Sequence, residues 1–238
     1  LSLPTAVAMS QFARGVGYVV TTGRFARAAR TKEKSLSWRR ARSALAAGTP
    51  IIAFNMLTSV TINSGVILTQ IMSTPHQVGL FAACFALSQS ALAVSAAFKT
   101  RIQTALFSEH ARRLVYRELG VLAAIGGAGA LTVGLLASPI TLFLLGPEFS
   151  GADRVLQILA LGTLGQLLLD SMHGIQVGLG RRSSLILTGS TGAAIALTTM
   201  CILVPTAGAM GAAVGVSAGY WGAAIVGLLV VRKGLREA

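Results

Sequence analysis

The sequence predicts an all-α, polytopic membrane protein: a bundle of six transmembrane helices preceded by part of another helix. Composition and the placement of charge predict this class. Hydrophobic residues make up 53% of the 238 and charged residues only 11%, whereas an ordinary soluble domain is about a quarter charged. The apolar residues are gathered into long runs, and the basic residues lie between these runs.

Six apolar runs give the six predicted spans. We expect the spans at 44–72, 78–98, 119–145, 155–179, 185–204 and 210–231. A helix of about 20 apolar residues crosses the hydrocarbon core of a bilayer, and each run is near or above that length. Turns that contain Gly or Pro separate several of the runs, at 73–77, 146–154 and 205–209.

Two segments precede the six-helix lobe at 44–238. Residues 1–22 are apolar but short for a span, and we interpret them as the end of a helix that belongs to a longer protein. Arg14 lies within this segment and is expected to reach the membrane interface, with a substrate-facing role as the alternative. Residues 23–43 are strongly basic and are expected to form a cytoplasmic linker helix on the membrane surface.

The net charge of +13 is also typical of nucleic-acid-binding proteins, but its placement here favours anionic lipid headgroups as the partner. Of the 20 Lys and Arg residues, 18 fall in four segments: 23–43, 99–118, 181–182 and 232–236. Only Arg154 falls in a turn on the opposite side. Positive charge collects on the cytoplasmic side of membrane proteins, so we expect these four segments in the cytoplasm and no nucleic-acid partner.

The predicted span 155–179 carries the main candidate site. Asp170 lies near its middle, and Gln166 and His173 share one helical face with it. An ionisable residue within a membrane crossing usually belongs to a path for a polar substrate or an ion. A polar cluster that only holds helices together is the structural alternative.

A second polar line lies on the predicted span 44–72. Asn55, Ser59 and Asn63 repeat every four residues and therefore share a face. Such side chains hydrogen-bond between helices or line a cavity, and the spacing leaves both interpretations open. In the second, they would face Asp170 across that cavity.

Enzymatic function is not expected. The three histidines fall at different levels of the predicted bundle, so they do not predict a catalytic triad. Asp170 and His173 offer two metal ligands where at least three are needed, so we expect no metal site and no cofactor. A membrane-embedded glycosyl- or acyltransferase is an alternative, for which the predicted outer side offers only His76, Glu148 and Asp153.

Five stretches together resemble a known family. They are GTPIIAFNML, VGLFAACFALSQ, GPEFSGADRVLQILALGTL, GIQVGLGRRSSLILTGSTGA and LVPTAGAMGAAVGVSAGYW. In order and spacing they resemble the C-terminal half of polysaccharide-export flippases of the multidrug/oligosaccharidyl-lipid/polysaccharide exporter superfamily. The resemblance covers residues 44–236, and it rests on the order of five weak motifs.

The resemblance implies a fold and a function. The chain would be the C-terminal lobe of a two-lobed transporter in the bacterial inner membrane. It would flip a polyprenyl-diphosphate-linked oligosaccharide by alternating access, for export of a surface polysaccharide. Its partners would be this lipid, the surrounding membrane lipids and an N-terminal lobe of the same protein.

With such a substrate, the positions of the candidate residues in the spans suggest their roles. Arg14, Lys99 and Arg101, near the ends of spans, would capture the substrate diphosphate. The polar residues at mid-depth would meet the sugars: Asp170, Gln166, His173, Asn55, Ser59 and Asn63. The alternative within the superfamily is a cation-coupled multidrug or toxin exporter, which Asp170 favours because proton- and Na⁺-coupled antiporters use intramembrane acids.

Overall fold

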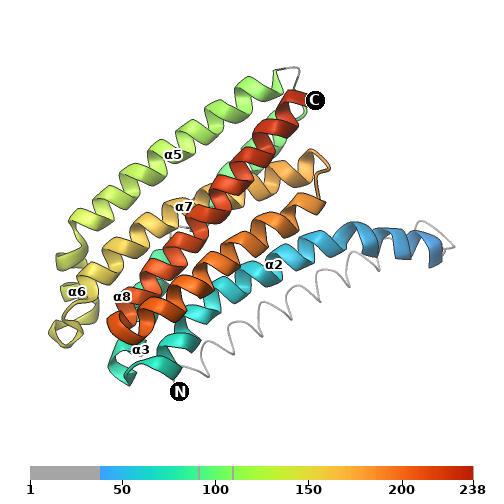
Figure 1. Cartoon of the computed structure of the whole chain (residues 1–238). Coiled ribbons are helices and arrows are strands. Elements are labelled where there is room, and N and C mark those ends of the chain that lie inside the picture. The colour runs from blue at the N-terminus through green and yellow to red at the C-terminus, as the bar shows by residue number, and fades with distance from the viewer. Residues whose placement is uncertain (1–37, 91, 109, 238) are drawn as a thin grey trace, which may run out of the picture. The chain divides into compact units, whose positions relative to one another are not determined.

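The computed structural model describes residues 38–90, 92–108 and 110–237 (Figure 1). The predicted partial helix 1–22, with Arg14, lies outside the described residues, as does most of the predicted linker 23–43. The chain divides into two units, residues 1–48 and 49–238. Of the first unit the structure describes only residues 38–48, which begin helix α2 (Trp38–Met72).

The described residues of the second unit contain helices and turns and no strand, which confirms the all-α prediction. After α2 come α3 (Pro75–Gln89), α4 (Leu92–Ala105), α5 (Ala111–Leu135), α6 (Ala137–Leu145), the 3₁₀ turn η1 (Pro147–Phe149), α7 (Ala152–Gly178) and α8 (Ser183–Glu237). Within the described part, four helical stretches have the length and apolar composition to cross a membrane: Gly48–Met72, Ala111–Leu135, Ala152–Gly178 and Ser183–Glu237. They indicate a multi-pass membrane protein, and the number of six spans stays a prediction.

The predicted span 78–98 is not one continuous helix, because the helix is interrupted between α3 and α4. The hydroxyls of Ser88 and Ser90 donate to the carbonyls three residues earlier, Phe85 and Leu87, each at 2.7 Å. Such side-chain bonds compete with the helical backbone ladder. The two helices have 15 and 14 residues, so neither alone reaches the length of a membrane crossing.

The predicted span 119–145 also differs from the structure. Its helix α5 begins earlier, at Ala111, within the basic segment 99–118. Val115 and Leu119, one turn apart, are both buried, so the basic stretch has an apolar face that extends the helix into the core. The helix then breaks at Leu136, since Pro139 has no N–H to donate to the carbonyl of Leu135.

Helix α8 is a hairpin of two helices joined at Gly208. This residue has φ +52°, a conformation that favours glycine, and it lies within the predicted turn 205–209. The two halves pack closely at Gly192 and Gly219: a Cβ on Gly219 would lie 2.8 Å from the carbonyl oxygen of Gly192. Small residues at such a crossing let two helix backbones approach, as is common in membrane proteins.

The three turns predicted to share the outer side meet at one end of the bundle. The His76 ring hydrogen-bonds the carbonyl of Glu148 at 3.3 Å and stacks on Phe149. The side-chain oxygen of Gln77 accepts a bond from the backbone N–H of Ala209 at 3.0 Å. The predicted grouping of these turns is therefore confirmed, while the side of the membrane they face stays a prediction.

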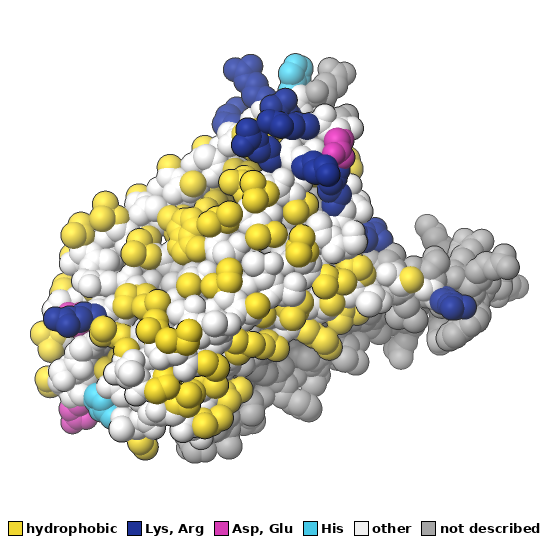
Figure 2. Space-filling model, viewed as in Figure 1, with side chains coloured by type: hydrophobic (Ala, Val, Ile, Leu, Met, Phe, Trp, Pro, Cys, Tyr) yellow, Lys and Arg dark blue, Asp and Glu magenta, His cyan; other side chains and the backbone are white. Residues whose placement is uncertain are grey.

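The basic segments meet at the opposite end. Buried residues from α4, α5, α7 and α8 form one cluster there: Ile102, Ala105, Val115, Leu119, Met172, Ile175, Val231 and Leu235. Arg181, after α7, pairs with Glu237 at the end of α8. Figure 2 shows Lys and Arg side chains gathered at this end, above an apolar surface. Among the described residues, positive charge is thus concentrated at one end of the bundle, as the sequence predicted.

Helix α7 is central in the second unit. It packs against α3, α4, α5, α6 and α8, and its residues 171–176 are buried without interruption. A side chain on α7 therefore points toward another helix at almost every position. The candidate polar side chains on α7 are therefore held among the neighbouring helices.

Candidate functional site

The three polar residues predicted on α7 lie among packed helices. Gln166 is 3% exposed and His173 is 9% exposed, and Asp170, between them, is half-buried. In a membrane protein a polar residue at this depth needs a partner within the bundle or water, because lipid offers it neither. The structure supplies such partners from α3 and α8.

Gln166 is bonded to a residue that the sequence analysis did not select. The amide nitrogen of Gln89, the last residue of α3, donates to the Gln166 side-chain oxygen at 3.2 Å. Gln89 is the only amide in the apolar stretch VGLFAACFALSQ, and this was the signal that could have revealed it. The bond joins the end of α3 to the middle of α7.

Asp170 faces the second half of α8. Tyr220 is only 3% exposed, and its buried hydroxyl has no hydrogen-bond partner among the described residues; the charge of Asp170 and the side chain of Gln89 both act on it. The sequence places Tyr220 at mid-depth of its span but does not show which helix it faces. Gln89, Gln166, Asp170 and Tyr220 form one polar cluster inside the bundle, which we call the mid-membrane cluster.

His173 lies apart from this cluster, against α2. Its ring stacks on Phe54 with 4.4 Å between ring centroids and 24° between the planes. Its Nε2 atom is buried and has no hydrogen-bond partner among the described residues. Lys99 of α4 lies on the same side and exerts a charge on the ring. His173 therefore keeps one unused hydrogen-bonding atom near a cation.

The polar line on α2 does not face α7. Asn55 and Ser59 are exposed, and the Asn63 amide donates to the carbonyl of Ser59 in its own helix at 2.8 Å. Thr58 and Thr61 turn inward instead and line a small cavity with Tyr220 and other residues of α7 and α8. The expected contact of Asn55, Ser59 and Asn63 with Asp170 is absent, because the line lies on the outer face of α2.

The inward face of α2 also leaves little space for a ligand. The cavity beside Thr58, Thr61 and Tyr220 has a volume of about 10 Å³. This is near the lower limit for one water molecule. A sugar therefore has no room between α2, α7 and α8 in this conformation.

Lys99 and Arg101 lie at the basic end, but Arg101 is already paired. Its guanidinium contacts the Glu118 carboxylate at 3.2 Å, and Arg117 contacts the same carboxylate at 3.2 Å. Glu118 is buried whereas both arginines are largely exposed. Arg101 also lies over the Phe98 ring, 5.7 Å from its centroid. It therefore has a structural role as well as any role in binding.

A further buried group was missed on α7. Gln176 is fully buried, and its amide bonds Thr188 at 3.4 Å and accepts from Ser184 at 3.2 Å. These bonds tie the end of α7 to the start of α8. Because both partners of Gln176 lie at the start of α8, these hydrogen bonds stabilise the tight turn between α7 and α8. They engage the polar atoms of Gln176 within the protein, so we do not assign it to ligand binding.

Comparison with models of protein families, with curated proteins and with solved structures finds no match. The resemblance to flippases thus rests on the five motifs of the sequence. Within the described residues, no group of three His, Cys, Asp or Glu side chains could hold a metal ion.

Proposed function

We propose that this chain is one lobe of a flippase that moves a polyprenyl-diphosphate-linked oligosaccharide across the bacterial inner membrane by alternating access. The observation that carries the proposal is the mid-membrane cluster around Asp170. Burying a carboxylate and two amides in a membrane bundle is costly, and such groups usually mark a path for a polar substrate or an ion. The five motifs supply the family and thereby the class of substrate.

The helix arrangement is compatible with six crossings. In this proposal α2 and α7 each cross once, α3 with α4 forms one crossing, α5 with α6 forms another, and the two halves of α8 form two. Breaks at Ser90 and Leu136 would then lie within crossings. Interrupted helices of this kind are tolerated where neighbouring helices and side chains satisfy the backbone.

The closed packing around Tyr220 suggests where the substrate would pass. A sugar has no room between α2, α7 and α8, so the path would run along the lobe and not through it. Asn55 and Ser59 are exposed on α2 beside the apolar side chains of Met56 and Val60, and the Asn55 and Ser59 side chains would be unfavourable against lipid. We therefore propose the substrate cavity on this face of α2, between the chain and a second lobe, with Asp170 acting inside the lobe as an ion-coupling group.

The basic end would receive the diphosphate. Lys99 acts electrostatically on His173, whose Nε2 atom is buried without a hydrogen-bond partner among the described residues. Lys99 is the better candidate for this contact, because Arg101 is held by Glu118. Arg14 keeps the same proposed role, although it lies outside the described residues.

The second candidate is a cation-coupled exporter of drugs or toxins, which Asp170 specifically favours. The two functions differ in what accumulates when the gene is lost. Deletion of the gene should abolish the surface polysaccharide and leave its lipid-linked precursor in the inner leaflet, and the full-length gene should restore export. Normal surface polysaccharide with increased sensitivity to cationic drugs would favour the exporter instead.

A further inference from the structure

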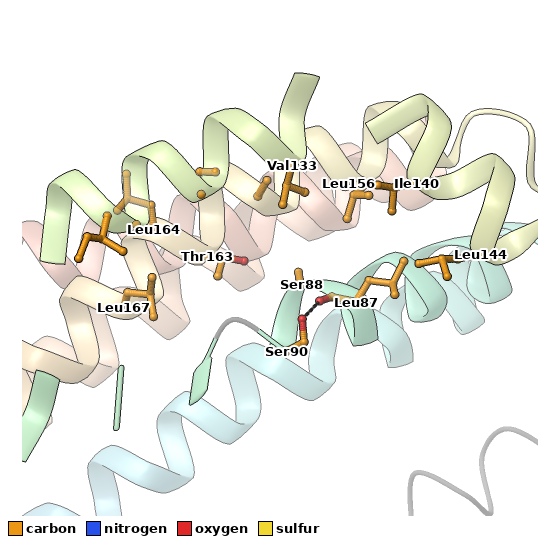
Figure 3. A pocket seen from close by; sticks show the side chains of 15 residues that line it. Leu87, Ser88, Ser90, Val133, Ile140, Leu144, Leu156, Thr163, Leu164 and Leu167 are labelled. Carbon is orange, nitrogen blue, oxygen red and sulfur yellow. Dashed lines mark hydrogen bonds between the residues drawn. The ribbon is translucent and has the colours of Figure 1, made fainter. Parts of the chain in front are cut away.

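An apolar groove lies between α3 and α5, along α7. Its volume is about 460 Å³. Leu156, Thr163, Leu164 and Leu167 of α7 form its floor, and they recur on one face of that helix. Figure 3 shows Leu144 of α6 at one end of the groove and Leu167 at the other.

The groove offers no hydrogen-bond donor to an occupant. It is lined by three hydroxyl side chains, and each donates its proton to a carbonyl of its own helix: Ser88 to Phe85, Ser90 to Leu87, and Thr163 to Leu159, at 2.7–2.8 Å. The other lining residues are apolar side chains and glycines. The three hydroxyl oxygens can still accept hydrogen bonds, but they are the only polar side chains of the lining, so it matches hydrocarbon better than water or a sugar.

The length of the groove matches one leaflet of a bilayer. Leu156 and Leu167 are eleven residues apart on α7, which is roughly 16 Å of helix. One leaflet contributes about half of a hydrocarbon core of about 30 Å. At the Leu167 end the groove is closed, since Leu167 packs with Phe98 and Leu122 in a buried cluster.

Small residues on α5 make the space. Gly126, Gly129 and Ala130 line the groove where larger residues would fill it. A Cβ on Gly129 would meet no atom within 4 Å. Ile125 and Leu144, half-exposed at 49% and 54%, border the groove toward the surroundings. The space is therefore accessible from the lipid side of the bundle.

We infer that this groove binds one acyl chain of a bilayer phospholipid, from the leaflet on the Glu148 side. The apolar lining selects hydrocarbon, and the length of the groove fits a chain confined to one leaflet. Phospholipid is also the most abundant hydrocarbon at this depth. The inference does not depend on the proposed transport role, because it requires only that α5 and α7 lie in a membrane.

The test is photo-crosslinking in vesicles. The full-length protein is reconstituted in phosphatidylcholine that contains a phosphatidylcholine with a diazirine in the middle of one acyl chain, and labelled residues are mapped by mass spectrometry. Groove residues such as Val133 and Leu164 should be labelled more strongly than the exposed residues Leu131, Leu135 and Phe143. Equal labelling of groove and exposed residues would overturn the inference.

Two glycines on α5 give a matched pair of variants. Gly129→Leu fills the groove, whereas Gly127→Leu puts the same side chain into open space outside it. Groove labelling should fall several-fold in Gly129→Leu and be unchanged in Gly127→Leu. Unchanged labelling in Gly129→Leu would contradict the inference. So would loss of the acyl label on adding one polyprenyl phosphate per protein, because the occupant would then be an isoprenoid.

Discussion

The side-chain oxygen of Gln77 accepts a hydrogen bond from the backbone N–H of Ala209 at 3.0 Å, joining the start of α3 to the hinge of α8. Ala209 is fully buried and follows Gly208, where the helical backbone is interrupted. The first N–H groups after an interruption have no partner in their own helix. Gln77 therefore caps the second half of α8 from another helix and fixes the position of the hinge.

Replacing Gln77 should destabilise the protein in a way that depends on the acceptor oxygen. Gln77→Ala leaves the N–H of Ala209 buried and unpaired, which costs about 1–3 kcal/mol. Gln77→Glu keeps a side-chain oxygen and should lose much less. The melting temperature of the purified protein in detergent measures both changes. Equal melting temperatures for the Ala variant and the original protein would show that the bond does not stabilise the hinge.

The close crossing in α8 should not accept even one methyl group. In Gly219→Ala the new Cβ would lie 2.6 Å from the Cβ of Ala196 and 2.8 Å from the oxygen of Gly192. Overpacking of this kind costs about 1–3 kcal/mol. Gly120→Ala is the control, since a Cβ there meets nothing within 4 Å. Thermal unfolding of the two variants should differ accordingly, and equal unfolding would mean that the crossing is looser than described.

Lys99 and Arg101 should respond differently to the same substitution. Lys99→Gln should reduce export at normal protein abundance. Arg101→Gln should also destabilise the protein, by about 1–2 kcal/mol, because the buried Glu118 keeps only Arg117. The double variant Arg101→Gln with Glu118→Gln should recover much of that stability. Abundance in the membrane and thermal unfolding are the measurements; an Arg101→Gln protein as stable as the original would contradict the structural role.

The proposed orientation can be tested with single cysteines. In a background with Cys84→Ala and Cys201→Ala, cysteines at Thr74 and Ser150 should react in intact cells with a membrane-impermeant thiol reagent. A cysteine at Arg112, at the opposite end, should react only after the cells are opened. The reason is that basic segments stay on the cytoplasmic side. Labelling of the Arg112 position alone in intact cells would reverse the orientation.

The sequence predicted the apolar helices and their turns well where hydropathy decides the outcome. Helix α7 begins three residues before the predicted span 155–179 and ends one residue before its end. The α8 hairpin begins two residues before the predicted span 185–204, ends six residues after the predicted span 210–231, and has its hinge at Gly208 within the predicted turn 205–209. The breaks at Ser90 and Leu136 were not predicted. The break at Leu136 arises from a missing proline N–H, which changes the backbone without changing hydropathy. The break after Ser90 carries no such signal in the sequence.

Half of the candidate site followed from the sequence. Gln166 and Asp170 are recognisable because each is a polar residue in an apolar helix. Their partners Gln89 and Tyr220 come from other helices, and finding them requires the rotation of each helix about its axis. The sequence also does not give the rotation of α2 about its axis. The expectation that Asn55 and Ser59 face Asp170 was therefore wrong: they have the right spacing but lie on the outer face of α2.

The role of Asp170 is the central claim, and one substitution tests it most directly. Asp170→Asn keeps the size of the side chain and most of its hydrogen bonding while removing the charge. The measurement is export of the surface polysaccharide by the full-length protein, at protein abundance verified in the membrane. The proposal predicts normal abundance and failed export in Asp170→Asn. Normal export in Asp170→Asn, with reduced abundance only in Asp170→Leu, would contradict it and make Asp170 a packing residue.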